Sequence, residues 1–111
     1  MSTNRSNDIV TVSDWSACYN IPDNLLVVSC TVSSADSNHL ITGIGLLVNN
    51  AEGATLASFY NGMSSGSEHL YPAFNLEPGH LHVDDTVWAI AQGECAGQHF
   101  FVEQELTSGR C

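Results

Sequence analysis

The sequence contains no lysine, and its arginines are limited to Arg5 and Arg110. With 12 acidic residues, the formal net charge at pH 7 is −10. Binding to a nucleic-acid backbone or to an anionic membrane surface depends on clustered lysine and arginine side chains. The composition therefore argues against nucleic acid as a partner. It also excludes Schiff-base catalysis by a lysine and phosphate binding by a P-loop.

Long apolar runs are also missing. No stretch approaches the roughly 20 residues that a membrane-spanning helix needs, so we expect no membrane insertion. Residues 1–8 are polar and lack the apolar centre of a signal peptide, so we expect none in this chain. Hydrophobic residues make up 43% of the 111, which suffices for one modest core. We predict a polar N-terminal segment, 1–8, followed by one domain, 9–111.

A helical pattern is absent too, because apolar residues do not recur at helical spacing in any window. Short β-branched and aromatic runs alternate with turn residues instead, which is typical of strands. The predicted strands are 9–13, 25–33, 39–48, 54–60, 69–74 (interrupted at Pro72), 80–83, 86–92 and 98–106. Residues 84–88, Asp-Asp-Thr-Val-Trp, resemble the acid-then-aromatic entry to the sixth strand of immunoglobulin-like domains. We predict an all-β, immunoglobulin-like antiparallel sandwich, with a jelly roll or small β-barrel as the alternative.

The four cysteines are Cys18, Cys30, Cys95 and Cys111, and no two have C-x-x-C spacing. Their even number is compatible with two disulfides, although the sequence does not fix the pairing. Cys30 and Cys95 have about the separation of the inter-sheet pair of immunoglobulin-like domains, which would leave Cys18 to pair with Cys111. Buried thiols are the alternative. Disulfides and a surface rich in Ser, Thr and Asn favour an extracellular or particle-surface location.

The segment 79–85, Gly-His-Leu-His-Val-Asp-Asp, carries the strongest metal-ligand pattern. On a strand, His80, His82 and Asp84 would point to one face, where two imidazoles and a carboxylate suit a divalent transition metal. The His-x-His pair resembles the first metal-binding motif of cupins, which implies a small oxygenase, isomerase or lyase. No glutamate follows His82 at the cupin spacing, and no second histidine motif follows either. Two solvated histidines at a strand start are the alternative.

Two strands look too apolar for an isolated domain. Segment 39–48 would present Ile41 and Leu47 to solvent, and the last strand would present His99 and Phe101. Outward apolar residues on a last strand often mark a subunit interface, so we expect a homo-oligomer. Exposed aromatic rings next to amide side chains also suit a carbohydrate. The predicted ligand-binding residues are Trp15, Tyr60, Asn61 and Tyr71, whereas Trp88 is expected in the core.

No catalytic motif stands out. Residues 62–66 fit G-x-S-x-G, but a nucleophile elbow needs a following helix, which the sequence does not predict. We therefore expect a non-enzymatic binding or self-assembly module of the fibre, virion, adhesion or lectin type. Its partners would be further copies of itself, a carbohydrate or another protein. The alternative is the small metal-dependent enzyme described above.

Overall fold

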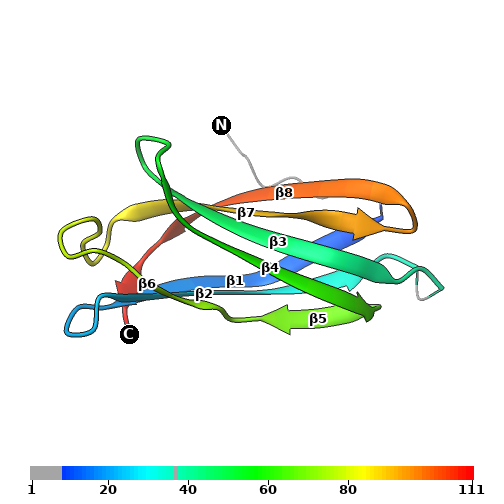
Figure 1. Cartoon of the computed structure of the whole chain (residues 1–111), viewed down its shortest axis with the longest axis horizontal. Helices are drawn as coiled ribbons and strands as arrows, with labels where there is room; N and C mark the ends of the chain where they lie inside the picture. The colour runs from blue at the N-terminus through cyan, green and yellow to red at the C-terminus, as the bar shows by residue number, and fades with distance from the viewer. Residues whose placement is uncertain (1–8, 37) are drawn as a thin grey trace.

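The computed structural model of the protein describes residues 9–36 and 38–111, so the predicted segment 1–8 lies outside the described residues. Within them, β-strands form two sheets that pack face to face (Figure 1). The strands are β1 (Val10–Asn20), β2 (Leu25–Ser34), β3 (Ile41–Asn50), β4 (Thr55–Ser65), β5 (Ser67–Leu70), β6 (Ala73–Asn75), β7 (Thr86–Cys95), β8 (Gln98–Thr107) and β9 (Gly109–Arg110). This arrangement confirms the prediction of an all-β sandwich.

One sheet has the strand order β5-β2-β1-β9, with β6 also paired to β2, and the other has the order β4-β3-β7-β8. All pairs are antiparallel except β1 with β9, which is parallel. The immunoglobulin-like assignment stays a prediction. The described residues include no helix long and apolar enough to cross a membrane.

The core lies between the two sheets and follows the alternation of side chains along each strand. On β2, Leu26, Val28, Cys30 and Val32 are fully buried, as the sequence predicts for this face. The facing sheet contributes buried side chains from alternate positions of its strands, namely Ile44, Leu46 and Val48 of β3, Val87, Ala89 and Ala91 of β7, and Phe100 and Val102 of β8.

A bulge in β1 changes which residues of that strand face the core. The register with β2 shifts between Ser13 and Ser16, and Asp14 adopts a left-handed backbone with a φ of 57°. Because the bulge adds one residue to β1, the inward positions change from Val10 and Val12 to odd-numbered residues. Trp15 consequently packs against the core.

A second bulge, in β3, overturns the expected orientation of Ile41. The register with β7 pairs Ile41 with Cys95 and Gly43 with Glu94, so one extra residue lies in β3 between these pairs. The extra residue reverses the alternation, and Ile41 is fully buried in the core instead of facing solvent. Ile41 therefore does not belong to an exposed interface.

The predicted segment 80–83 does not form a strand. It lies in the connection between β6 and β7, whose backbone turns through hydrogen bonds from His80 N to Glu77 O and from Asp85 N to His82 O. The Oγ of buried Ser108 donates to the carbonyl oxygens of Asp85 (3.0 Å) and His82 (3.4 Å), which fixes this connection to the end of β8. The side chains of the His-x-His pair therefore do not alternate as they would on a strand.

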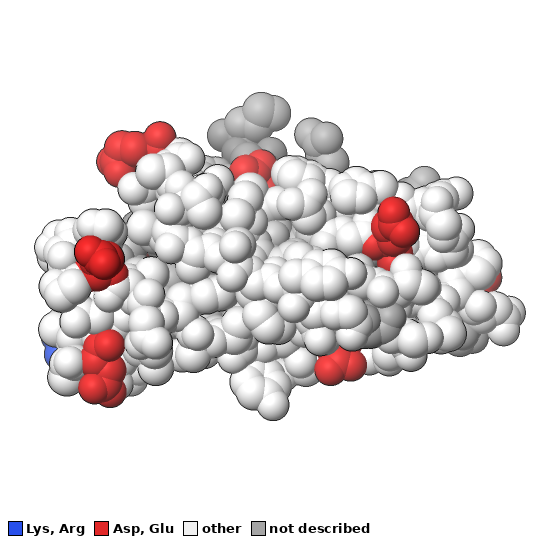
Figure 2. All heavy atoms as spheres, in the orientation of Figure 1, with Lys and Arg blue, Asp and Glu red and all other residues white. Residues whose placement is uncertain are grey.

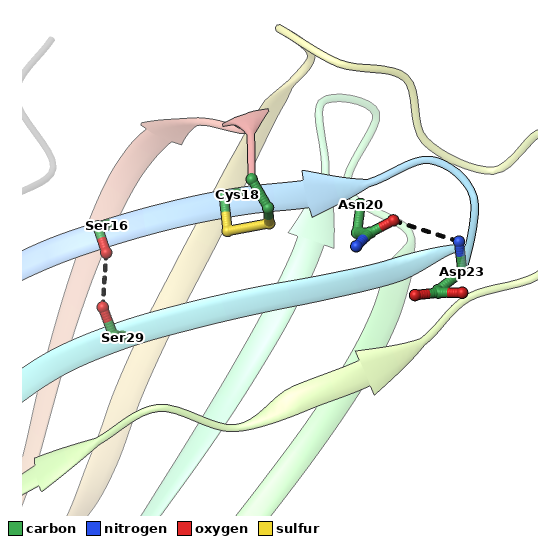
Figure 3. The surroundings of a disulfide bond; sticks show 6 residues. Ser16, Cys18, Asn20, Asp23 and Ser29 are labelled. Atoms are coloured by element: carbon green, nitrogen blue, oxygen red, sulfur yellow. Dashed lines mark hydrogen bonds between the residues drawn. A yellow bond between two sulfur atoms is a disulfide. The ribbon is translucent and has the colours of Figure 1, made fainter.

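The cysteines form one disulfide rather than two. Cys18 of β1 is bonded to Cys111, which follows β9 (Figure 3). Cys30 and Cys95 are buried free thiols, so the predicted second pair does not form. The two sheets align so that the Sγ of Cys95 lies 3.6 Å from the hydroxyl of Ser34, four residues along β2 from Cys30. The disulfide is consistent with an oxidising, extracytoplasmic location.

Candidate functional site

The surface of the β4-β3-β7-β8 sheet that points away from the other sheet carries the strongest candidate site, and we call it the outer face. The strand registers arrange its side chains in rows across the four strands. The rows are Gly62, Gly43, Glu94 and His99; Tyr60, Gly45, Gln92 and Phe101; Ser58, Leu47, Ile90 and Glu103; and Thr55, Asn49, Trp88 and Glu105. Leu47, His99 and Phe101 thus lie on the outward face that the sequence predicts for them.

Tyr60 lies against the glycines of β3 on this face. A Cβ atom added to Gly43 would lie 2.5 Å from the Tyr60 hydroxyl oxygen, and one added to Gly45 would lie 3.9 Å from the ring. The ring therefore occupies space that a side chain at Gly43 would need. Its relative exposure is nevertheless 72%, so most of the ring remains open to solvent.

A hollow of about 440 Å³ adjoins this ring. Its lining residues come from β3, β4, β7 and β8, and they are Thr42, Gly43, Gly45, Tyr60, Gln92, Gly93, Glu94 and His99. Gln92, Glu94 and His99 offer an amide, a carboxylate and an imidazole, while the glycines leave the floor without side chains. The hollow thus combines the Tyr60 ring with hydrogen-bonding groups of several kinds, and a few convergent polar groups of this sort fix the orientation of a bound small molecule.

A close backbone contact supports the floor of the hollow. A Cβ atom on Gly93 would lie 2.0 Å from the carbonyl oxygen of Gly43, a distance that no side chain tolerates. Beside it, the Thr42 hydroxyl donates a 3.4 Å hydrogen bond to the backbone carbonyl of Glu94. The β3 bulge therefore needs glycine on β7 and holds Thr42 and Glu94 at one end of the hollow.

A second hollow, of about 380 Å³, lies farther along the outer face. It is lined by Asn49, Ala51, Glu52, Gly53, Trp88 and Glu103. Trp88 is half-buried and pairs with Asn49 across the β3–β7 register. The expectation that Trp88 belongs to the core is therefore wrong, because its position on β7 falls on the outward alternation between buried Val87 and Ala89.

A third hollow lies at the β4 edge and contains two of the predicted ligand-binding residues. Asn61 and exposed Tyr71 line it together with Phe59, Glu68, His69, Leu70 and Pro72. The Tyr71 and His69 rings lie 5.7 Å apart between centroids, and the His69 Nδ1 is 2.9 Å from the Thr31 hydroxyl. Tyr60, which directly precedes Asn61 on β4, points to the outer face instead. The structure therefore separates Tyr60 from Asn61 and Tyr71. Trp15 lines none of these three hollows.

The residues of the metal hypothesis do not converge. His80 and Asp84 line a polar hollow, whereas His82 lines a different one beside Tyr19. The His82 Nδ1 lies 3.5 Å from the Asp85 carboxylate, and both side chains are well exposed. Among residues 9–36 and 38–111, no group of three or more His, Cys, Asp or Glu side chains is arranged to hold a metal ion. The geometric basis of the cupin-like alternative is therefore absent from the described residues.

Charge is distributed unevenly over the outer face. In Figure 2, which shows the molecule with β3 and β4 in front, most acidic side chains lie toward the outline, and one acidic group lies inside it near the end of β7. On the outer face itself the carboxylates are Glu94, Glu103 and Glu105, so the two middle rows carry no charged residue from β4 to β7. Arg110, the one lysine or arginine within the described residues, is on β9 in the other sheet. The outer face thus lacks the cations that would bind an anionic ligand.

Most of the residues that line the first hollow were not predicted from the sequence. Tyr60 and His99 stand out there as an aromatic and an interface residue, but Thr42, Gln92 and Glu94 do not. A signal was present in Gly43 and Gly45, which interrupt the apolar segment 39–48, whereas Gly93 follows the predicted strand 86–92 and gave none. A glycine inside a strand often marks a bulge or a close backbone approach.

Comparison with known proteins gives the fold but no family. No family model matches the chain, and no curated protein matches it in sequence. Among solved structures, it is similar to part of OgpA from Akkermansia muciniphila in two crystal forms. The TM-scores are 0.58 and 0.59, the sequence identities 15% and 14%, and the matches cover 88% of this chain. The chain spans 27–28% of the length of OgpA, and at this identity the likeness shows a shared fold alone.

Proposed function

We propose that this chain is a non-enzymatic carbohydrate-binding module that binds a neutral saccharide in the hollow beside Tyr60. The observation that carries the proposal is the Tyr60 ring, which lies against Gly43 and Gly45 and leaves most of its surface open. The C–H faces of a pyranose pack on an aromatic ring, while its hydroxyls need planar polar partners close by. Gln92, Glu94 and His99 supply such partners around the glycine floor.

The charge of the protein supports the choice of a neutral ligand. The net charge is −10, and the described outer face carries acidic groups without a compensating lysine or arginine. Sulfated, sialylated and uronic-acid-rich glycans would therefore meet repulsion as they approach. The disulfide and the Ser-, Thr- and Asn-rich sequence support an extracellular setting, where such glycans are encountered.

The test compares two tyrosines of nearly equal exposure. Tyr60→Ala removes the ring beside the hollow, and Tyr71→Ala removes a ring that is 69% exposed at the β4 edge. On a glycan array followed by calorimetric titration, wild type and Tyr71→Ala should bind the same neutral saccharide. Tyr60→Ala should bind it about tenfold more weakly, since aromatic contacts contribute about 0.5–1.5 kcal/mol beyond area burial. Absence of saccharide binding, or equal effects of both substitutions, would overturn the proposal.

Self-association through the same face is a second candidate function. Phe101 is 40% exposed and lies in the same row as Tyr60, and Leu47 lies in the next row. Two negatively charged copies would meet with least repulsion over the two middle rows of this face, which are uncharged from β4 to β7. Saccharide binding and self-association would then compete for one surface, and this competition can be measured.

A further inference from the structure

The two hollows of the outer face lie on one surface and have a similar construction. Each has one aromatic residue, Tyr60 or Trp88, together with at least one carboxylate and one side-chain amide. Leu47 and Ile90 occupy the row between them. Ile90 is 8% exposed although it lies outside the main core cluster, which means that outer-face neighbours cover it. An apolar strip therefore connects the hollows.

Strand geometry gives the separation of the two aromatic positions. Along the sheet, the rows that contain Tyr60 and Trp88 are four residues apart, and across it their strands are two spacings apart. At about 3.3 Å per residue and about 4.8 Å per strand, the positions lie about 16 Å from each other. A single pyranose ring reaches one hollow only, whereas a chain of several rings reaches both.

The second hollow also has an unsatisfied acceptor. The side-chain oxygen of Asn49 is buried and has no hydrogen-bond partner among the described residues. An unpaired buried acceptor is unfavourable, and the terminal torsion of an asparagine is soft enough to turn this oxygen toward the hollow that the residue lines. A ligand hydroxyl in the hollow would then supply the missing donor.

We infer that the ligand is an oligosaccharide chain that lies diagonally across the outer face, from the Tyr60 hollow over Leu47 and Ile90 to the Trp88 hollow. This inference rests on the proposed carbohydrate-binding function and specifies the ligand class. A β-1,4-linked chain of equatorially substituted pyranoses suits the surface best, because it is ribbon-shaped and exposes apolar C–H faces. The middle rows of the face, uncharged from β4 to β7, agree with a neutral chain.

The test is the dependence of affinity on chain length. Wild-type protein is titrated with β-1,4-linked oligomers of glucose, N-acetylglucosamine, mannose and xylose, each from monomer to hexamer. For at least one series, we expect the hexamer to bind at least about tenfold more tightly than the disaccharide. In Trp88→Ala this gain should disappear, while the affinity for the disaccharide stays within about twofold of wild type.

Because Trp88 is half-buried, a second measurement avoids its removal. The sequence has two tryptophans, Trp15 and Trp88, so a Trp15→Phe variant reports on Trp88 fluorescence alone. The hexamer should shift this emission, and the disaccharide should leave it unchanged. Length-independent binding that Tyr60→Ala weakens would overturn the chain inference and leave the proposed function standing. Failure of every saccharide, here and on the array, would overturn both.

Discussion

At the scale of single residues, the contacts of Gly43 and Gly93 shape the candidate site most directly. Gly43 leaves room for the Tyr60 ring, and Gly93 leaves room for the carbonyl of Gly43. Neither contact is visible in the sequence, because each joins residues on different strands. The position of the ring depends on the absence of a side chain at Gly43, and the floor of the hollow depends on the absence of a side chain at Gly93.

Gly43→Ala should displace the Tyr60 ring without removing it. The added methyl would lie 2.5 Å from the Tyr60 hydroxyl oxygen, whereas one at Gly62 would lie 3.9 Å from the ring. We expect Gly43→Ala to weaken saccharide binding several-fold and Gly62→Ala to leave it unchanged, as measured by calorimetric titration. Equal affinities of both variants would show that the position of the ring does not matter.

Gly93→Ala should destabilise the fold. The new Cβ would lie 2.0 Å from a backbone oxygen, so the β3 and β7 strands must separate locally. Overpacking of this kind costs about 1–3 kcal/mol, and we expect a loss near the upper end of that range in urea unfolding. Gly66→Ala is the control, because a Cβ there meets nothing within 4 Å. Similar stability of the two variants would contradict the close contact.

The buried thiol of Cys30 should make stability depend on alkaline pH. Burial raises the pKa of this thiol from 9.0 to about 12. In the unfolded chain the thiol loses its proton near pH 9, whereas in the folded chain it keeps the proton until about pH 12. Its contribution is therefore fully present below pH 9 and is lost as the pH rises toward 12, by at most about 1.4 kcal/mol per unit.

Urea unfolding of wild type and Cys30→Ala between pH 8 and pH 10 checks this dependence. The variant should be less stable at pH 8, because the smaller side chain leaves a cavity, but its stability should fall less steeply above pH 9. Parallel profiles would mean that the thiol ionises equally in the folded and unfolded chains.

At the scale of secondary-structure elements, alternation of apolar residues predicts most strands, and the errors have local physical causes. The strand 25–33 is found nearly as predicted because its apolar residues alternate without interruption, and the break at Pro72 separates β5 from β6. Segment 61–68, which lies between the predicted strands 54–60 and 69–74, is largely strand, since β3 pairs with it at Asn61, Gly62 and Ser65. Bulges at Asp14 and Thr42 reverse the alternation, and a pattern of period two cannot show where this happens.

The connection between β6 and β7 fails as a predicted strand for a different reason. His80 to Val83 alternate polar and apolar side chains, but the backbone there bonds to its own turns and to Ser108 rather than to a neighbouring strand. Local alternation is thus overridden by a tertiary contact with the end of β8. The metal hypothesis depended on that strand, and its geometric basis disappears with it.

The short strand β9 should depend on the disulfide. It pairs with β1 only at Cys18 with Gly109 and at Tyr19 with Arg110, and the Cys18–Cys111 bond spans 93 residues of sequence. Replacing both cysteines by serine should lower the free energy of unfolding by about 2–4 kcal/mol. Thermal unfolding with and without reductant measures this, with reductant expected to have no effect on the double variant. Unchanged stability of wild type on reduction would contradict the prediction.

At the scale of the whole molecule, the outer face brings exposed aromatic and apolar side chains from four strands onto one surface. Its middle rows are uncharged from β4 to β7 and include exposed Tyr60 and Phe101, although the chain as a whole is strongly acidic. The sequence predicts that such an apolar surface exists, from Leu47 and Phe101. It does not show that the surface is hollowed, because the hollows arise from the pairing of four strands.

Oligomeric state tests the alternative use of this face. If copies associate through it, Phe101→Asp should yield monomers, because each copy would then bury an unpaired carboxylate in the interface. Native mass spectrometry and gel filtration of wild type and variant measure this directly. A wild-type monomer, or an oligomer that Phe101→Asp leaves intact, would remove self-association through the outer face from consideration.

Mapping the ligand surface in solution tests saccharide binding by the outer face directly. In a ¹H–¹⁵N spectrum recorded during titration with the tightest-binding saccharide, the shifting amides should belong to the outer face, including Gly43, Gly45, Gln92 and Glu94. Amides of β1 and β2 should stay in place. Shifts confined to the β4-edge hollow around Tyr71 or to the other sheet, or no shifts with any saccharide, would contradict saccharide binding on the outer face.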